Sequence, residues 1–122
     1  MITPKDFFNL AVELKEGTDE VVIRTSINRS YYYVYHYIMM RCKQRIIHLK
    51  EREGIKSLHI ALVKFFRKQR ERRLAEMIER LRRMRTYADY ELERSFNKRD
   101  AEEAIKMASS IVSLFDNSSL CH

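Results

Sequence analysis

Apolar residues recur along the chain at helical spacing, and no segment shows the alternation of a β-strand. The first helical stretch lies between Thr3 and Gly17, and the second runs from about residue 19 to 53. The third begins at Ser57, and the last two cover about residues 72–94 and 98–115. Short connections favour antiparallel packing, so the prediction is an all-α fold: an up-and-down antiparallel four-helix bundle with one additional short helix. It forms a single domain over residues 1–122, with its core in about 3–115.

The predicted helices begin and end at residues suited to those positions. Thr3 precedes Pro4, a combination typical of a helix start, and Ser57 is a second N-cap candidate. Gly54 is expected to end the long second helix. The polar tail from Asp116 to the C-terminus is expected to fray.

The second predicted helix has two non-polar faces. One stripe is typical of a core and contains Ile23, Ile27, Tyr31, Val34, Ile38, Cys42 and Leu49. The opposite face and its flank contain Val22, Arg29, Tyr32, Tyr33, His36, Met39, Met40 and Ile47. A helix with two such faces is either central in its domain or half in an interface. Tyrosine and methionine are enriched in interfaces, so we expect this face to meet another chain or a ligand.

Two arginines stand where a phosphate could bind. Arg85 lies within about 20° of the centre of the apolar stripe of the fourth helix. Its nearest partner in sequence is Asp89, so it either forms an intrahelical pair against tyrosine hydroxyls or belongs to an anion site between the second and fourth helices. Arg29 and His36 share one helix face, where they either reach one phosphate together or complete a buried polar network.

The net charge of +7 is concentrated in residues 64–85, which contain ten Lys and Arg against three Glu, while the rest of the chain has fourteen of each sign. This stretch is either an electrostatic footprint for RNA or an ordinary solvated helix with i,i+4 ion pairs. The arginines that would contact RNA are Arg72, Arg73, Arg80 and Arg83.

Several functional classes are disfavoured. The longest uncharged run, residues 30–40, is too short to span a membrane, and the two cysteines have no metal-ligand spacing. There is no phosphate-binding glycine loop, nucleophile elbow, pair of catalytic carboxylates or His/Cys metal set. We therefore expect no metal, no cofactor and no membrane association, and a cytoplasmic location with reduced cysteines.

Three separated motifs resemble those of the HEPN family over about residues 5–115. They are Arg29-Ser30-Tyr31-Tyr32 with His36, the helix start Ser57-Leu58-His59, and LRRMRTYADY at residues 81–90. The resemblance implies a helical bundle that is commonly a homodimer and often the partner of a small nucleotidyltransferase in prokaryotic toxin–antitoxin pairs. Many relatives are metal-independent ribonucleases that use an arginine followed after four to six residues by a histidine. In some relatives a nearby tyrosine is adenylylated, for which Tyr87 and Tyr90 are candidates.

The carried-over ribonuclease motif is incomplete. Arg85 matches the arginine, but Tyr90 stands in place of the histidine, and a phenol with an ordinary pKa of about 10 is a poor base at pH 7. Catalysis would therefore depend on Arg85 with His36 or Tyr90, and binding on Arg29, Tyr32, Tyr33 and Asp89. The preferred interpretation is a non-catalytic or weakly catalytic partner of a nucleotidyltransferase that binds RNA or a nucleotide. The alternatives are a metal-independent ribonuclease toxin and a structural protein that dimerises.

Overall fold

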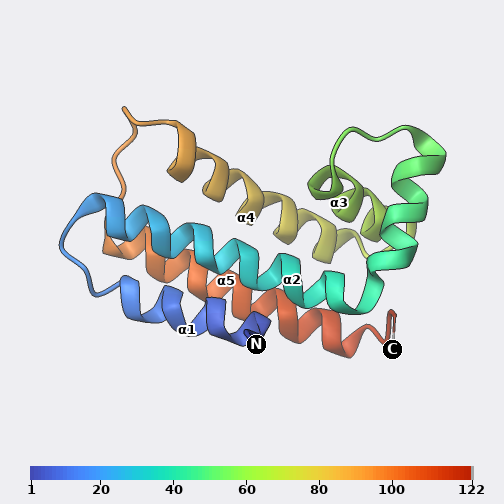
Figure 1. The fold of residues 1–122 in the computed structure, drawn as a ribbon, viewed down its shortest axis with the longest axis horizontal. Helices are drawn as coiled ribbons and strands as arrows, with labels where there is room; N and C mark the ends of the chain where they lie inside the picture. The colour runs from blue at the N-terminus through green and yellow to red at the C-terminus, as the bar shows by residue number, and fades with distance from the viewer. Residues whose placement is uncertain (122) are drawn as a thin grey trace.

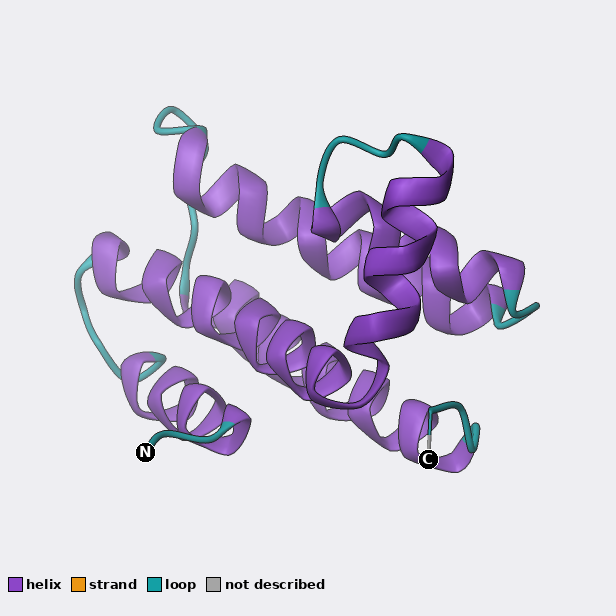
Figure 2. Cartoon of the chain, turned by 45° about the vertical axis from the view of Figure 1, so that its right-hand side comes forward, coloured by secondary structure: helices purple, strands orange, loops and turns teal. Residues whose placement is uncertain are grey.

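The computed structural model describes residues 1–121, which form five helices joined by short loops (Figure 1). Their bounds are α1 Pro4–Leu14, α2 Glu20–Glu53, α3 Leu58–Lys68, α4 Arg72–Tyr90 and α5 Lys98–Asn117. No strand occurs in this part of the chain (Figure 2). The all-α prediction and the five predicted helices are confirmed.

Helix α2 is the centre of the bundle, since it packs against each of the other four helices. The first part of α2 runs alongside α1, α4 and α5, and its C-terminal part turns away toward α3 (Figure 1). Helix α3 packs against both α2 and α4 at that end of the molecule. The second non-polar face of α2 is covered in part by α1, because Phe8 packs on Tyr33 with 4.9 Å between ring centroids.

The predicted caps are present. Asp6 accepts a hydrogen bond from the backbone N–H of Thr3 at 2.6 Å, and Ser57 accepts one from the N–H of Ile60 at 3.2 Å. Gly54 ends α2 with a φ of 64°, a left-handed conformation that glycine adopts without a steric penalty.

Helix α4 ends at Tyr90, four residues earlier than the sequence pattern predicts. The guanidinium group of Arg24 causes this, because it donates to the carbonyl oxygens of Ala88 at 2.9 Å and Glu91 at 3.1 Å, and also to that of Arg94. Because a side chain from α2 satisfies these carbonyls, they do not need the next helical turn. The chain can therefore leave the helix and turn toward α5. Leu92, predicted to lie on the buried stripe, is 82% exposed.

The C-terminal tail is anchored. Helix α5 extends to Asn117, and Cys121 forms a disulfide with Cys42 of α2. The structure therefore corrects the expectations of reduced cysteines and of a frayed tail for residues 116–121, whereas His122 lies outside the described residues. Within the described chain, none of the helices has the length and apolar character that a membrane span requires.

Candidate functional site

Arg85 points from α4 into the seam between α4 and α2. The residue is only 9% exposed, and its guanidinium carbon lies 5.4 Å and 5.7 Å from the ring centroids of Tyr31 and Tyr32. One terminal nitrogen donates to Asp89 at 3.3 Å. The Nε atom is buried and has no hydrogen-bond partner within the described residues. The seam thus holds a positive charge whose hydrogen-bonding capacity is only partly used.

A chain of hydrogen bonds links this arginine to a second one on α2. Asp89 also accepts from the side-chain amide of Asn28 at 3.0 Å, and the amide oxygen of Asn28 accepts from Arg29 at 2.9 Å. Asp89 is therefore bonded directly to Arg85 and connected through Asn28 to Arg29. The sequence pattern does not identify Asn28, because an asparagine on a helix carries no signal of its partner across the seam.

His59, in the first turn of α3, completes the seam from a third helix. Its Nδ1 lies 2.6 Å from the hydroxyl oxygen of Tyr31, and its ring lies 4.8 Å from that of Tyr35 and 5.9 Å from that of Tyr32. The second of the three sequence motifs contains His59, but a lone histidine in a helix start is usually structural, so sequence reasoning does not assign it to the site. We call the group Arg85, Asp89, Tyr31, Tyr32 and His59 the Arg85 seam.

The protonation of the Arg85 seam follows from burial and charge. Burial lowers the pKa of His59 below its ordinary value, and the positive charges of Arg85 and Arg82 lower it further. Burial raises the pKa of the Tyr31 hydroxyl. Both groups are therefore neutral at pH 7. Because a phenol is the stronger donor of the two, we assign donation by Tyr31 to Nδ1, which places the proton of His59 on Nε2.

His36 lies beside the seam but is separated from Arg29 by α1. The ring of Phe7 packs on His36 with 4.9 Å between centroids, and the guanidinium carbon of Arg29 lies 5.8 Å from the same ring. A phosphate shared by Arg29 and His36 would have to displace Phe7. Burial lowers the pKa of His36, and its ring lies 5.8 Å from that of Tyr32, which also contacts Arg85.

Two other predicted site residues lie outside the seam. Tyr33 is 6% exposed and packs beneath α1, so its ring is not available to a ligand without movement of that helix. Tyr90 is 72% exposed, and it is five residues from Arg85 on the same helix, about 140° around its axis. The structure brings neither of them to Arg85.

The four arginines predicted to contact RNA are all exposed on α4; they are Arg72, Arg73, Arg80 and Arg83. Arg80 is paired with Glu103 of α5 at 2.9 Å, and Arg83 lies 3.5 Å from Glu79. Arg72 lines a hollow with Arg67, Arg70 and Glu76 at the turn between α3 and α4. The N-terminal end of α4 therefore has more unpaired positive charge than its middle.

The chain is thus an all-helical bundle that buries an arginine of its fourth helix against paired tyrosines of its second. The family model of the HEPN domain matches residues 5–118, and the chain belongs to the HEPN domain family. Neither a curated protein nor a solved structure matches it significantly. Among residues 1–121, no three His, Cys, Asp or Glu side chains are grouped so that they could hold a metal ion.

Proposed function

We propose that this HEPN protein binds RNA by taking a backbone phosphate into the Arg85 seam, and that it is at most weakly catalytic. The observation that carries the proposal is the buried Nε of Arg85, which has no hydrogen-bond partner in the described chain. A guanidinium group removed from water is costly unless its donors are paired. Asp89 satisfies one donor at 3.3 Å. A phosphate oxygen that enters the seam, with a shift of the Arg85 side chain, would supply both a further acceptor and negative charge.

The assigned tautomer of His59 favours binding over catalysis. With Nδ1 occupied by the Tyr31 hydroxyl at 2.6 Å, the remaining ring nitrogen carries a proton and can donate to a phosphate. In that form His59 cannot accept the proton of a ribose 2′-hydroxyl, which metal-free RNA cleavage requires. Tyr90 is exposed and remote from Arg85, so it is not a substitute base.

Ribonuclease activity is the second candidate, because two histidines of lowered pKa contact Tyr32. His36 lies 5.8 Å and His59 5.9 Å from that ring, and both are neutral at pH 7. A neutral imidazole could accept the 2′-hydroxyl proton while the 2′-oxygen attacks phosphorus, the bond from phosphorus to the 5′-oxygen breaks, and the 5′-oxygen takes a proton from water. For His59, this would require the opposite tautomer, with Nδ1–H donating to Tyr31.

RNA binding is tested by fluorescence anisotropy of a labelled single-stranded oligonucleotide with Arg85→Met, which keeps the stem and removes the charge. The matched control is Arg99→Met, at an exposed position of α5. We expect the seam variant to lose about tenfold or more in affinity, since hydrogen bonds to charged groups contribute roughly 1.5–3 kcal/mol. Equal affinities of the two variants, at equal helical content by circular dichroism, would refute the proposal.

Incubation of the same RNA in EDTA separates the two candidate functions. We expect no cleavage by the wild-type protein. Cleavage that is abolished by Arg85→Met and by either His36→Gln or His59→Gln would instead establish the ribonuclease. Cleavage that survives all three substitutions would point to a contaminating enzyme. Further purification should then remove this activity from the sample.

Family membership supports a further part of the proposal, that the chain is a homodimer acting beside a small nucleotidyltransferase in a toxin–antitoxin-type pair. A neighbouring reading frame for such an enzyme is the first observation to seek, and co-purification of the two recombinant proteins is the test. Between the candidate acceptors of adenylylation, Tyr90 is 72% exposed, whereas the guanidinium group of Arg94 covers the Tyr87 ring at 4.0 Å. Intact-mass measurement after incubation with the enzyme and ATP, followed by peptide mapping, would identify the modified residue.

A further inference from the structure

The positive charge of this protein is concentrated at the end of the bundle where α3 packs on α2 and α4. Residues 41–73 contain twelve Lys and Arg against three Glu, a net charge of +9, while the remaining residues have twelve against fourteen. This stretch comprises the C-terminal part of α2, all of α3, the connections around it and the first two residues of α4. The whole excess of positive charge thus lies on one end of the molecule.

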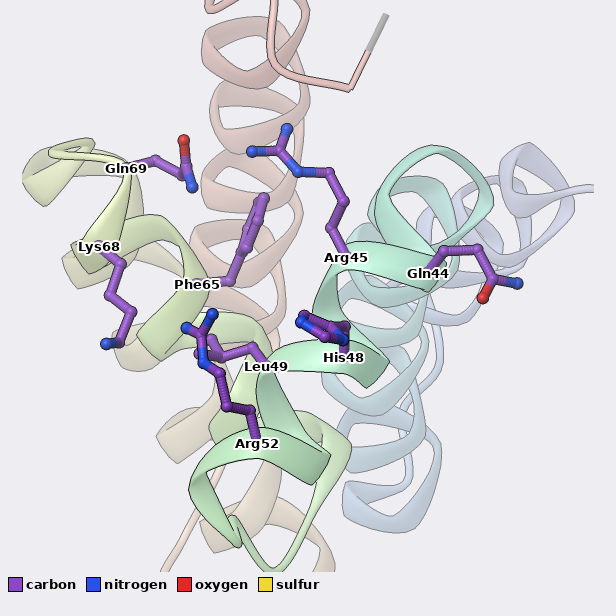
Figure 3. A pocket seen from close by; sticks show the side chains of 8 residues that line it. All are labelled: Gln44, Arg45, His48, Leu49, Arg52, Phe65, Lys68 and Gln69. Carbon is purple, nitrogen blue, oxygen red and sulfur yellow. The ribbon is translucent and has the colours of Figure 1, made fainter.

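A hollow of about 320 Å³ opens at this end between α2 and α3 (Figure 3). Its volume is at the lower end of the range of small-molecule sites, about 300–1,000 Å³. Residues 45, 48, 49 and 52 recur at helical spacing and form the α2 wall. Residues 65 and 68 of α3, with residue 69 directly after it, form the opposite wall. The lining residues are Gln44, Arg45, His48, Leu49, Arg52, Phe65, Lys68 and Gln69.

The hollow combines an apolar floor with cations at its edge. Leu49 and Phe65 are 4% and 3% exposed, so they close the floor and belong to the core. The guanidinium carbon of Arg45 lies 5.0 Å from the centroid of the Phe65 ring, and Figure 3 shows the side chains of Arg45 and Arg52 extending from α2 toward that ring. The guanidinium group of Arg45 is therefore held at a cation–π distance from an aromatic ring at the edge of the hollow.

The cations of the hollow are only partly neutralised. Glu53 lies 2.5 Å from Lys68, 2.7 Å from Lys64 and 3.5 Å from Arg52, so one carboxylate is shared by three positive charges. Arg45 has no carboxylate partner in the described chain; its guanidinium group meets the Phe65 ring, and the Cys121 sulfur at 3.7 Å. The edge of the hollow therefore carries a net positive charge that an anion would neutralise.

We propose that this hollow binds one nucleotide unit, with its phosphate at Arg52 and Lys68 and its base on the outer face of the Arg45 guanidinium group. Bases of single-stranded RNA stack on arginine planes, and lysine and arginine neutralise its phosphates. The nucleotide belongs either to a free mononucleotide or to an RNA strand. Along α2, Arg45 is thirteen residues beyond Tyr32, about 20 Å of helix path, so the hollow is a separate site from the Arg85 seam.

The test uses the full chain with Arg45→Glu/Arg52→Glu, and Lys43→Glu as the control on the same helix, exposed and outside the hollow. In anisotropy titrations of labelled single-stranded RNA over a range of salt, the double variant should bind more weakly. Its slope of log affinity against log salt should fall by about 0.7 for each phosphate that the variant no longer neutralises. Arg45→Lys keeps the charge, so it should keep the slope and bind roughly tenfold more weakly, because a lysine offers the base no plane to stack on.

Calorimetric titration with AMP identifies the source of the nucleotide. If the wild-type protein binds AMP and the double variant does not, the hollow binds a free nucleotide. If the wild-type protein does not bind AMP, but the double variant binds RNA more weakly, the hollow binds an RNA strand. The inference is overturned if the double variant and Lys43→Glu bind both RNA and AMP equally well. If the nucleotide belongs to an RNA strand, the inference rests on the proposed function and adds a second RNA contact to it. The two proposals can still be refuted separately, because Arg85→Met tests the seam and Arg45→Glu/Arg52→Glu tests the hollow.

Discussion

Removal of the Arg24 guanidinium group should destabilise the protein strongly, although no sequence pattern distinguishes this residue. Arg24 is 8% exposed and bonds the carbonyl oxygens of Ala88 at 2.9 Å and Glu91 at 3.1 Å, which end α4. A hydrogen bond to a charged group contributes about 1.5 kcal/mol or more, so Arg24→Met should lose roughly 3 kcal/mol. For 122 residues, an unfolding entropy of about 2.1 cal/mol/K per residue converts this into a fall in melting temperature of roughly 12 °C.

Thermal unfolding followed by circular dichroism measures this loss, and Arg99→Met, on the exposed face of α5, is the matched control. Arg24→Lys keeps the charge but not the planar fork that reaches several carbonyls, so it should fall between wild type and Arg24→Met. An Arg24→Met protein that melts within about 2 °C of the control, equivalent to roughly 0.5 kcal/mol, would show that water satisfies the end of α4 as well as the guanidinium group does.

Three further predictions concern stability. The disulfide between Cys42 and Cys121 joins residues 79 apart, so Cys121→Ser should lose about 4–5 kcal/mol in denaturant unfolding and should no longer respond to a reductant. Burial lowers the pKa of His59, so the unfolded state binds more protons below the ordinary value of 6.5; stability should fall as the pH decreases from about 7 to 5, and less steeply in His59→Gln. Gly54→Ala should cost about 1 kcal/mol in the same unfolding assay, because φ is 64° while a Cβ would meet nothing within 4 Å.

The helices were predictable because their signals are local. The Thr3 cap and the Gly54 stop are properties of a few neighbouring residues, and the structure has both. The C-terminal end of α4 was not predictable, since it depends on Arg24 more than 60 residues away. The pairing of Cys42 with Cys121 was not predictable for the same reason: sequence spacing says nothing of how α5 returns along α2.

The candidate site was predictable only where an anomaly pointed to it. A charged residue on an apolar stripe identified Arg85 and its partner Asp89, four residues further along the same helix. The contribution of His59 depends on how α3 crosses α2, which no periodicity encodes. The sequence spacing correctly places Arg29 and His36 on one face of α2. It gives no indication that Phe7 of the first helix lies against both side chains.

The run of five tyrosines between residues 31 and 37 is explained by the central position of α2. Successive residues of a helix point in directions 100° apart, so the tyrosines face different neighbouring helices. Tyr33 packs on α1, Tyr31 is hydrogen-bonded to His59 of α3, and Tyr37 donates to Asp116 of α5 at 2.7 Å. A phenol suits such a helix because its ring packs while its hydroxyl finds a partner. The two remaining tyrosines of the run, Tyr32 and Tyr35, stay half-buried, the first beside Arg85 and the second beside His59. The packing of the bundle thus leaves aromatic side chains next to the buried charge, and the proposed RNA site depends on this combination.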